Sequence, residues 1–139
     1  MTLAIGVTGI SLHREIPSRL VDADILCREI RSLLVDNGLG EASFPVELAA
    51  RECLNNAIIH GNRGDANKKV ALNLQIRRKW IYLRISDEGS GFNWRKAKRA
   101  PPPDCAGIRG RGLSIVDLYA DRITFNRRGN QVTLRLERS

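Results

Sequence analysis

Three polar residues recur at every fourth position near the middle of the sequence. They are Glu52, Asn56 and His60. Because each residue of an α-helix turns by about 100°, residues four apart stay on one face, so a helix here would carry a carboxylate, a carboxamide and an imidazole in one stripe. A carboxylate can act as a base, and a carboxamide oxygen can bind a hard cation. The spacing fits equally well three unrelated polar residues on a helix surface.

A glycine-rich turn follows an apolar, strand-like segment further along the chain. It reads Asp87-Glu-Gly89-Ser-Gly91. A carboxylate at the end of a strand can accept a hydrogen bond from an exocyclic amine such as that of adenine, and glycines let the backbone approach a flat ring closely. The alternative is an ordinary turn that ends a strand, since Asp and Gly are common in turns.

A second glycine-rich segment leads into a helical pattern and reads Gly107-Ile-Arg-Gly110-Arg111-Gly112-Leu113. Free N–H groups at a helix N-terminus bind phosphate, and the helix dipole assists. The segment is not a Walker loop, because no Gly-Lys-Ser/Thr follows it. It is not a Rossmann loop either, because no strand immediately precedes it. The three segments together indicate a nucleotide site.

Hydrophobic periodicity predicts the helices that would carry these groups. Residues 19–37 have helical spacing of apolar side chains, and Ser18 is expected to be the N-cap of that helix. Pro45 suits the first turn of the next helix. That helix is expected to run to His60 and to stop at Gly61.

Alternating apolar and polar residues predict the strands over residues 70–76, 80–86, 123–126 and 132–136. The last two are expected to form a hairpin around Gly129 and Asn130. Residues 3–16 are interpreted as one or two edge strands, and Gly110 is expected to open a short helix. This order predicts an α+β, two-layer sandwich, in which a mixed, mostly antiparallel sheet is covered on one face by helices.

The size and composition predict a single domain over residues 1–139. No apolar run approaches the roughly 18 residues of a membrane span. No basic region precedes a long apolar segment at the N-terminus, so a signal peptide is not expected. Cys27 and Cys53 are expected to be small core residues, and with Cys105 they form no C-x-x-C pair. These features predict a cytoplasmic protein without a membrane partner.

The net charge of +8 indicates solvated basic turns or an anionic partner. That partner would be the phosphates of a nucleotide, an acidic protein surface or a nucleic acid. Aromatic residues make up only 5% of the chain, and they are not interleaved with basic residues as in a base-stacking surface. Nucleic-acid binding is therefore the less favoured interpretation.

The three segments, in this order, resemble the motifs of the GHKL ATPase superfamily, which includes gyrase, histidine kinases and MutL. Glu52-x-x-x-Asn56-Ala-x-x-His60-Gly is similar to the N box, Asp87-x-Gly89-x-Gly91 to the G1 box, and Gly110-x-Gly112-Leu113 to the G2 box. The resemblance covers roughly residues 10–137. The chain looks most like the small, free-standing anti-sigma-factor serine kinases, because it reads Asn56-Ala-Ile-Ile-His60-Gly61-Asn62 and shows no dimerisation or phosphoacceptor-histidine domain.

The resemblance implies ATP and Mg²⁺ as cofactors and assigns roles to the polar stripe. Asn56 would bind Mg²⁺ between the phosphates, Glu52 would be the catalytic base, and His60 would lie near the phosphate end of the site. Asp87 would bind the adenine amino group, with glycines shaping the purine pocket. The rest of the implied cofactor-binding set is Gly89, Gly91, Gly107, Gly110, Arg111, Gly112 and Leu113. Residues 93–109 would form the ATP lid.

The resemblance also implies a function and partners. The protein would be an ATP-dependent serine kinase in a partner-switching system, phosphorylating an anti-sigma-factor antagonist of the STAS type and sequestering a sigma factor, and it would be a homodimer. The alternative is an ATP-binding switch module that binds a protein without catalysis. The family often has a Gly-Thr pair before the last strand, whose hydroxyl supports the adenine-binding aspartate. Here the sequence reads Gly129-Asn130-Gln131, so Asn130 or Thr133 would substitute, or adenine binding would be weaker.

Overall fold

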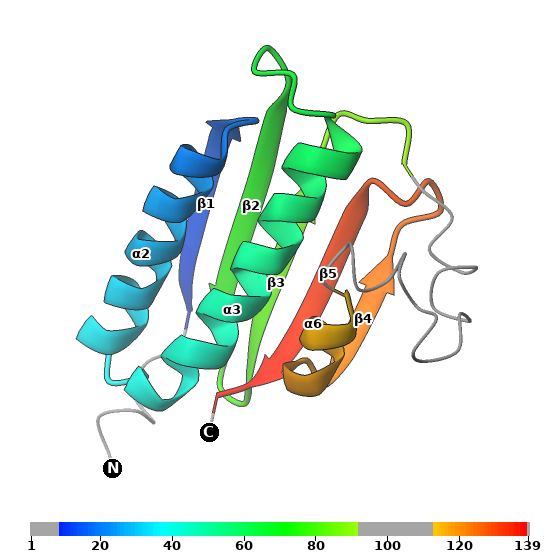
Figure 1. Cartoon of the computed structure of the whole chain (residues 1–139). Coiled ribbons are helices and arrows are strands. Elements are labelled where there is room, and N and C mark those ends of the chain that lie inside the picture. The colour runs from blue at the N-terminus through cyan, green and yellow to red at the C-terminus, as the bar shows by residue number, and fades with distance from the viewer. Residues whose placement is uncertain (1–8, 92–112, 139) are drawn as a thin grey trace.

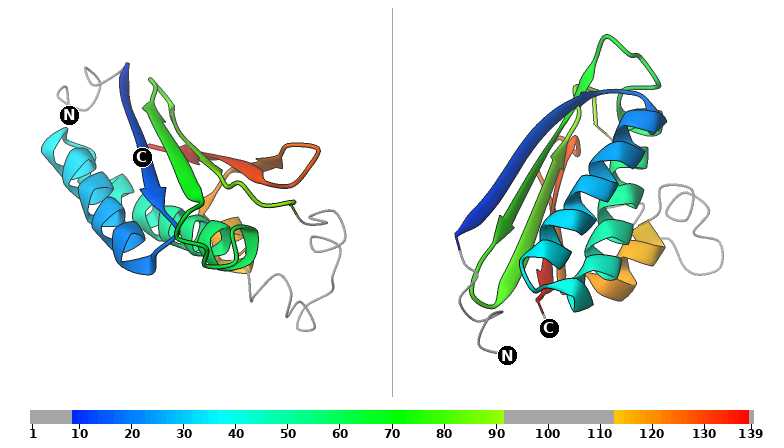
Figure 2. Two further views of the ribbon diagram at one scale, coloured as in Figure 1. Left: turned by 90° about the horizontal axis from the view of Figure 1, so that it is seen from above. Right: turned by 90° about the vertical axis from the view of Figure 1, so that its left-hand side faces the viewer.

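The computed structural model describes residues 9–91 and 113–138, which form two layers, with the helices on one face of a sheet (Figures 1 and 2). In chain order the elements are β1 (Ile10–Pro17), α2 (Leu20–Asp36), α3 (Gly40–Asn56), the π-helical turn η1 (Ala57–Gly61), β2 (Lys69–Ile76), β3 (Trp80–Ser86), α6 (Leu113–Tyr119), β4 (Arg122–Phe125) and β5 (Gln131–Glu137). Within the described ranges, no helix is long and apolar enough to cross a membrane.

The described strands are ordered β1-β2-β3-β5-β4, and each neighbouring pair is antiparallel. The predicted α+β sandwich is therefore confirmed, and the sheet is antiparallel at every described pairing. The segment predicted as one or two edge strands contains a single described strand, β1, at one edge of the sheet. Residues 1–8 lie outside the described residues.

The core lies between the sheet and the helices. The inward-facing residues of β2 and β3 have almost no exposure to solvent, and they are Val70, Leu72, Leu74, Ile76, Ile81, Leu83 and Ile85. They alternate with half-buried or exposed residues along each strand, as a sheet with one covered face requires. Burying each such side chain contributes about 1.5–3 kcal/mol, so this layer supplies much of the stability.

The predicted start of α3 is wrong, because the helix begins at Gly40 and includes Pro45. A proline lacks the N–H of one helical hydrogen bond. The turn before it has bonds of its own: the Ser43 hydroxyl donates to the Gly40 carbonyl at 2.6 Å, and the Ala42 N–H donates to the Leu39 carbonyl at 3.0 Å. The helix therefore forms ahead of the proline.

The predicted N-cap of α2 is also wrong. The residue at the N-cap is Arg19, and its side chain makes no capping bond. Ser18 is buried, and its hydroxyl donates to the Lys68 carbonyl at 2.7 Å. The hydroxyl is thus used to join the end of β1 to the start of β2, a long-range contact that local sequence does not reveal.

A buried asparagine connects the end of the helix to the sheet. Asn62 is 1% exposed, and its amide nitrogen donates to the Ser18 hydroxyl at 2.9 Å and to the Lys69 carbonyl at 3.0 Å. Its side-chain oxygen accepts a hydrogen bond from the N–H of Glu88 at 2.8 Å. The carboxylate of Glu88 in turn accepts from the N–H of Lys69. One side chain therefore holds the ends of β1, β2 and η1 and the turn after β3 together.

We predict that Asn62→Ala lowers the free energy of unfolding by about 2–3 kcal/mol, because it leaves buried polar groups of three segments without this partner. Urea unfolding at constant pH measures the change. Asn67→Ala in the exposed loop before β2 is the matched control, and it should stay within about 0.5 kcal/mol of the unsubstituted protein. Equal unfolding midpoints for the two variants would show that the Asn62 network does not stabilise the fold.

Candidate functional site

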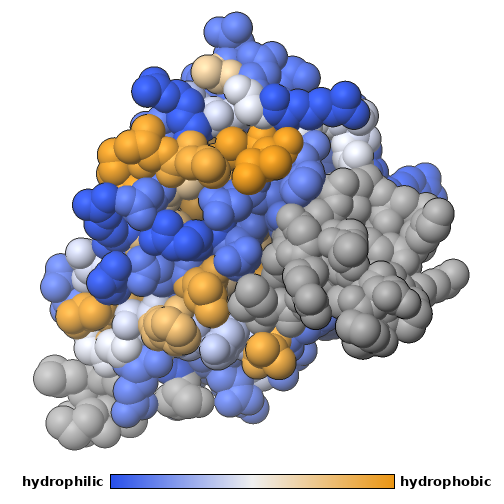
Figure 3. Space-filling model, viewed as in Figure 1, coloured by the Kyte–Doolittle hydropathy of each residue, from blue (hydrophilic) through white to orange (hydrophobic). Residues whose placement is uncertain are grey.

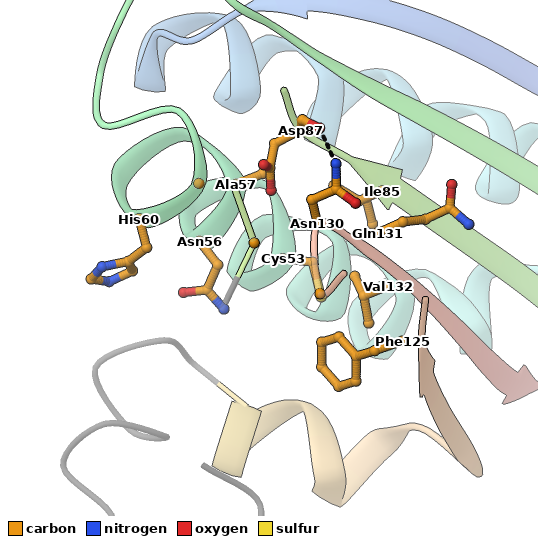
Figure 4. Close-up of a pocket in the computed structure, with 13 residues that line it drawn as sticks. Cys53, Asn56, Ala57, His60, Ile85, Asp87, Phe125, Asn130, Gln131 and Val132 are labelled. Atoms are coloured by element: carbon orange, nitrogen blue, oxygen red, sulfur yellow. Dashed lines mark hydrogen bonds between the residues drawn. The ribbon is translucent and has the colours of Figure 1, made fainter. Parts of the chain in front are cut away.

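A pocket opens between the end of the α3–η1 helix, the turn after β3 and the β4–β5 hairpin (Figure 4). In Figure 4, Asn56 and His60 project from the end of the helix, and Asp87 and Asn130 lie side by side across the pocket from them. The described residues that line it are Cys53, Asn56, Ala57, His60, Gly61, Ile85, Asp87, Gly91, Phe125, Gly129, Asn130, Gln131 and Val132. Four residues predicted from the sequence as site residues, from two separate motifs, are thus brought together: Asn56, His60, Asp87 and Gly91.

The helix that carries the polar stripe changes form in its last turn. The N–H of Asn62 donates to the carbonyl of Ala57 at 2.8 Å, a separation of five residues, so the turn is π-helical. Turns of this kind often occur at functional sites. Asn56 is half-buried and His60 is exposed, and both line the pocket. Glu52 is half-buried one helical turn earlier and is not among the described residues that line the pocket.

Three glycines allow the backbone segments around Asp87 to pack closely. A Cβ atom at Gly61 would overlap the Asp87 carboxylate, and one at Gly89 would overlap the carbonyl oxygen of Gly61. Gly91 has a φ of 89°, and a Cβ there would overlap the carbonyl oxygen of Arg128. Gly91 lines the pocket as expected. Gly89 instead lies against Gly61 and allows the helix end to approach the turn after β3.

Hydrogen bonds hold Asp87 at its carboxylate and at both backbone groups. Its Oδ1 accepts from the N–H of Gly89 at 2.8 Å. Its own N–H donates to the Asn130 carbonyl at 2.9 Å, and its carbonyl accepts from the Asn130 side chain at 3.1 Å (Figure 4). An ionised carboxylate held in this way can accept a hydrogen bond from an amine at the edge of a planar ring.

Asn130, and not Thr133, is the residue that contacts Asp87. Thr133 pairs with Arg84 across β3 and β5, and its hydroxyl lies 3.4 Å from the Arg84 guanidinium nitrogen Nε. Asn130 precedes β5 and lies in the pocket. Of the two expected substitutes for the family's threonine, the position of Asn130 is thus the one that can support the aspartate.

Much of the pocket lining is apolar, and it is formed by Cys53, Ala57, Ile85, Phe125 and Val132. A flat aromatic ring would bury its faces against such groups. Burial raises the pKa of the Cys53 thiol to about 12, so this side chain is neutral at pH 7 and packs as an apolar group. Cys27 and Cys53 are both buried, which confirms the prediction that they are core residues.

A metal ion at this site would depend on few protein groups. Among residues 9–91 and 113–138 there is no cluster of three or more His, Cys, Asp or Glu side chains that could hold one. Magnesium is commonly bound by one or two protein oxygens together with waters and the phosphates of a nucleotide. The Asn56 carboxamide in the pocket lining can supply such an oxygen, so the described residues fit a nucleotide-bound cation.

Part of the predicted site falls on residues 92–112. Gly107, Gly110, Arg111 and Gly112 lie outside the described residues, and so does the predicted ATP lid at residues 93–109. Leu113 is the first residue of α6.

Sequence analysis missed several residues that shape the site. The sequence presents Asn62 only as the last residue of the N-box segment, and Phe125 only as part of a predicted strand. Asn126 was not considered as a site residue, although it stands three residues before Gly129. An asparagine close to a glycine is a usable signal, because asparagine side chains commonly hydrogen-bond the backbone of the turn in which they lie.

A family model matches most of this chain. The model of the histidine kinase-like ATPase domain matches residues 16–136, a range that includes all three glycine- and asparagine-containing motifs. Among curated proteins, none matches this chain.

We predict that Gly89→Ala weakens ATP binding at least tenfold, because the added methyl group must displace the Gly61 carbonyl and thereby the helix end from Asp87. Isothermal titration calorimetry with Mg²⁺-ATP measures the affinity. Gly40→Ala is the control, because nothing lies within 4 Å of a Cβ at Gly40. It should leave binding unchanged and stability equal or higher by up to about 1 kcal/mol. Unchanged affinity in Gly89→Ala would contradict the packing argument.

We also predict that the buried thiols resist alkylation in the folded protein. Burial raises the pKa of Cys27 to about 11 and that of Cys53 to about 12, so the reactive thiolate is scarce at pH 8. In a Cys105→Ser background, iodoacetamide should label neither thiol in buffer and both in urea, as counted by intact mass. Rapid labelling of Cys53 in buffer would contradict this prediction, because it would show that the thiol in the pocket lining is accessible and forms the thiolate.

Proposed function

Because this chain belongs to the histidine kinase-like ATPase domain family, we propose that its pocket binds Mg²⁺-ATP for transfer of the γ-phosphate to a serine of a protein partner. ATP binding follows from the family. The observation that carries the rest is that the Asn56 carboxamide and the Asp87 carboxylate line one pocket with an apolar floor between sheet and helix. Such a pocket can bind a cation at Asn56 and a nucleobase that carries an amine at Asp87.

At the base end, Asp87 would accept a hydrogen bond from the exocyclic amine of adenine. The apolar lining would bury the ring, because Ile85, Val132 and Phe125 present side chains without competing polar groups. Two hydrogen bonds support this orientation of the base. Gly89 bonds the Asp87 carboxylate and Asn130 bonds the Asp87 carbonyl, and together they restrain the side chain that would meet the amine.

At the phosphate end, Asn56 would hold Mg²⁺, which supplies charge neutralisation at the phosphates. Glu52 stands four residues before Asn56 on the same helix. We assign its carboxylate to the incoming serine hydroxyl, whose proton it would accept. His60 would contact the phosphate end, and the net charge of +8 favours the approach of an anionic nucleotide.

We propose that the protein partners are an antagonist of the STAS type and a sigma factor, and that the protein is a homodimer. The resemblance of the N-box sequence supports the partner class. An exposed apolar surface beside the pocket supports protein binding: apolar side chains gather over the first turns of α2 and the end of α3 and η1 (Figure 3), and Val21, Ile25 and Ile59 are each about half exposed. Exposed apolar patches of this kind are typical of protein interaction sites.

The alternative is a switch module that binds ATP and a partner without phosphoryl transfer. One observation favours it: Glu52, the proposed base, is not among the described residues of the pocket lining. The two functions share the nucleotide site and differ only in whether a phosphate reaches the partner.

We predict that Glu52→Ala keeps its ATP affinity within about threefold but loses phosphoryl transfer by at least ~10²-fold, because a general base contributes that much to the transfer step. Incubation with labelled ATP and candidate antagonist proteins, followed by phosphosite mapping, measures transfer. Glu41→Ala, an exposed glutamate at the other end of α3, is the matched control and should transfer normally.

Transfer at the native rate by Glu52→Ala would remove the assigned base. ATP binding by the unsubstituted protein with no transfer to any candidate would favour the switch module.

A further inference from the structure

The turn between β4 and β5 is organised by a single side chain. The side-chain oxygen of Asn126 accepts hydrogen bonds from three successive backbone N–H groups, those of Gly129 at 2.8 Å, Asn130 at 3.1 Å and Gln131 at 3.2 Å. Gly129 is buried and has a φ of 83°, which suits glycine. The position of Asn130 in the pocket therefore depends on Asn126.

A second bond of Asn126 sets the orientation of the Asn130 amide. The Asn126 side-chain nitrogen donates to the Asn130 side-chain oxygen at 2.7 Å, and the Asn130 nitrogen donates to the Asp87 carbonyl at 3.1 Å. A carbonyl can only accept, so the nitrogen of Asn130 must face Asp87 and its oxygen must face Asn126. Asn126 must then present its own nitrogen to Asn130 and its oxygen to the turn. The chain of bonds from the turn to Asp87 has only one consistent direction.

We propose that Asn126 and Asn130 are positioning residues that make the pocket select a purine with an amine at C6 over one with a carbonyl. This inference rests on the proposed ATP site. The two asparagines act through Asp87: Asn130 holds its backbone at both the N–H and the carbonyl, and Asn126 orients Asn130. An ionised carboxylate accepts hydrogen bonds only, so it favours an amine and repels a carbonyl oxygen, and the discrimination depends on how firmly it is held.

The arrangement also accounts for the absence of the threonine that the family often has before its last strand. A threonine has a short side chain with one hydroxyl, which can donate one hydrogen bond and accept others. The longer Asn130 side chain reaches the Asp87 backbone and needs Asn126 to orient it. Asn126 and Asn130 are both half-buried on the hairpin and are not members of the buried apolar core, so changing them should affect recognition more than folding.

The test compares ATP with inosine triphosphate, which carries a carbonyl oxygen in place of the amine. Calorimetry on the full chain should give at least about tenfold tighter binding of ATP. In Asn130→Ala the affinity for ATP should fall about five- to tenfold, the cost of one well-placed hydrogen bond, while that for inosine triphosphate changes less than about twofold. The preference for ATP should therefore shrink.

Asn126→Asp is the sharper variant. The new carboxylate still accepts from the three N–H groups, so the turn and the melting temperature should be retained. It cannot donate to Asn130, so the Asn130 amide should turn its nitrogen toward the new carboxylate and its oxygen toward the Asp87 carbonyl. The preference for ATP should shrink as in Asn130→Ala. Asn67→Asp in the exposed loop makes the same chemical change away from the pocket and should keep the preference.

The outcomes separate this inference from the proposed function. If the unsubstituted protein prefers ATP and both variants keep that preference, the inference is wrong and the ATP site stands. Equal weakening of both nucleotides with a lower melting temperature would show a structural role only and would also overturn it. If the unsubstituted protein binds ATP and inosine triphosphate equally well, Asp87 does not read the amine. If it binds neither, the proposed site itself is wrong.

Discussion

The site depends on the close approach of two backbone segments, the end of the helix at Gly61 and the turn at Gly89. No side chain fits at either position, because a Cβ at Gly89 would overlap the Gly61 carbonyl and one at Gly61 would overlap the Asp87 carboxylate. Gly61 is the last residue of the π-helical turn and makes this contact. Asn62 follows it directly, and its side chain hydrogen-bonds the helix end to the sheet. The two halves of the pocket, with Asn56 on one and Asp87 on the other, come together because of this contact.

Asparagine side chains organise the turns around the described part of the pocket. Asn62 holds the turn that follows β3 through the N–H of Glu88, while Asn126 and Asn130 hold the same turn through Asp87. A carboxamide suits this task because it donates and accepts at once without carrying charge, so it can bridge two backbone groups at little electrostatic cost. The Asp87 carboxylate accepts from the neutral N–H of Gly89, and the Asp87 carbonyl accepts from the neutral side chain of Asn130.

Much of the fold could be predicted from the sequence, because periodicity reports burial. The alternation of Val70, Leu72 and Leu74 specified β2, and the α+β sandwich followed from the order of elements. The errors concern contacts between distant segments. Ser18 bonds to Lys68 instead of capping a helix, and α3 begins before Pro45 because its first turn has other partners. The spacing of the polar stripe predicted Asn56 and His60 at the site. It could not show that Glu52 is not among the described residues that line the pocket, or that the last turn is π-helical. The choice between Asn130 and Thr133 depended on the strand register, which the sequence does not display.

The most direct test is a crystal structure of the full chain with Mg²⁺ and a non-hydrolysable ATP analogue. The account predicts that the Asn56 side-chain oxygen coordinates the metal and that the Asp87 carboxylate accepts a hydrogen bond from the adenine amine, with the ring against Ile85 and Phe125. A nucleotide bound elsewhere, or bound in this pocket with its base beside Asn56 and its phosphates beside Asp87, would contradict it.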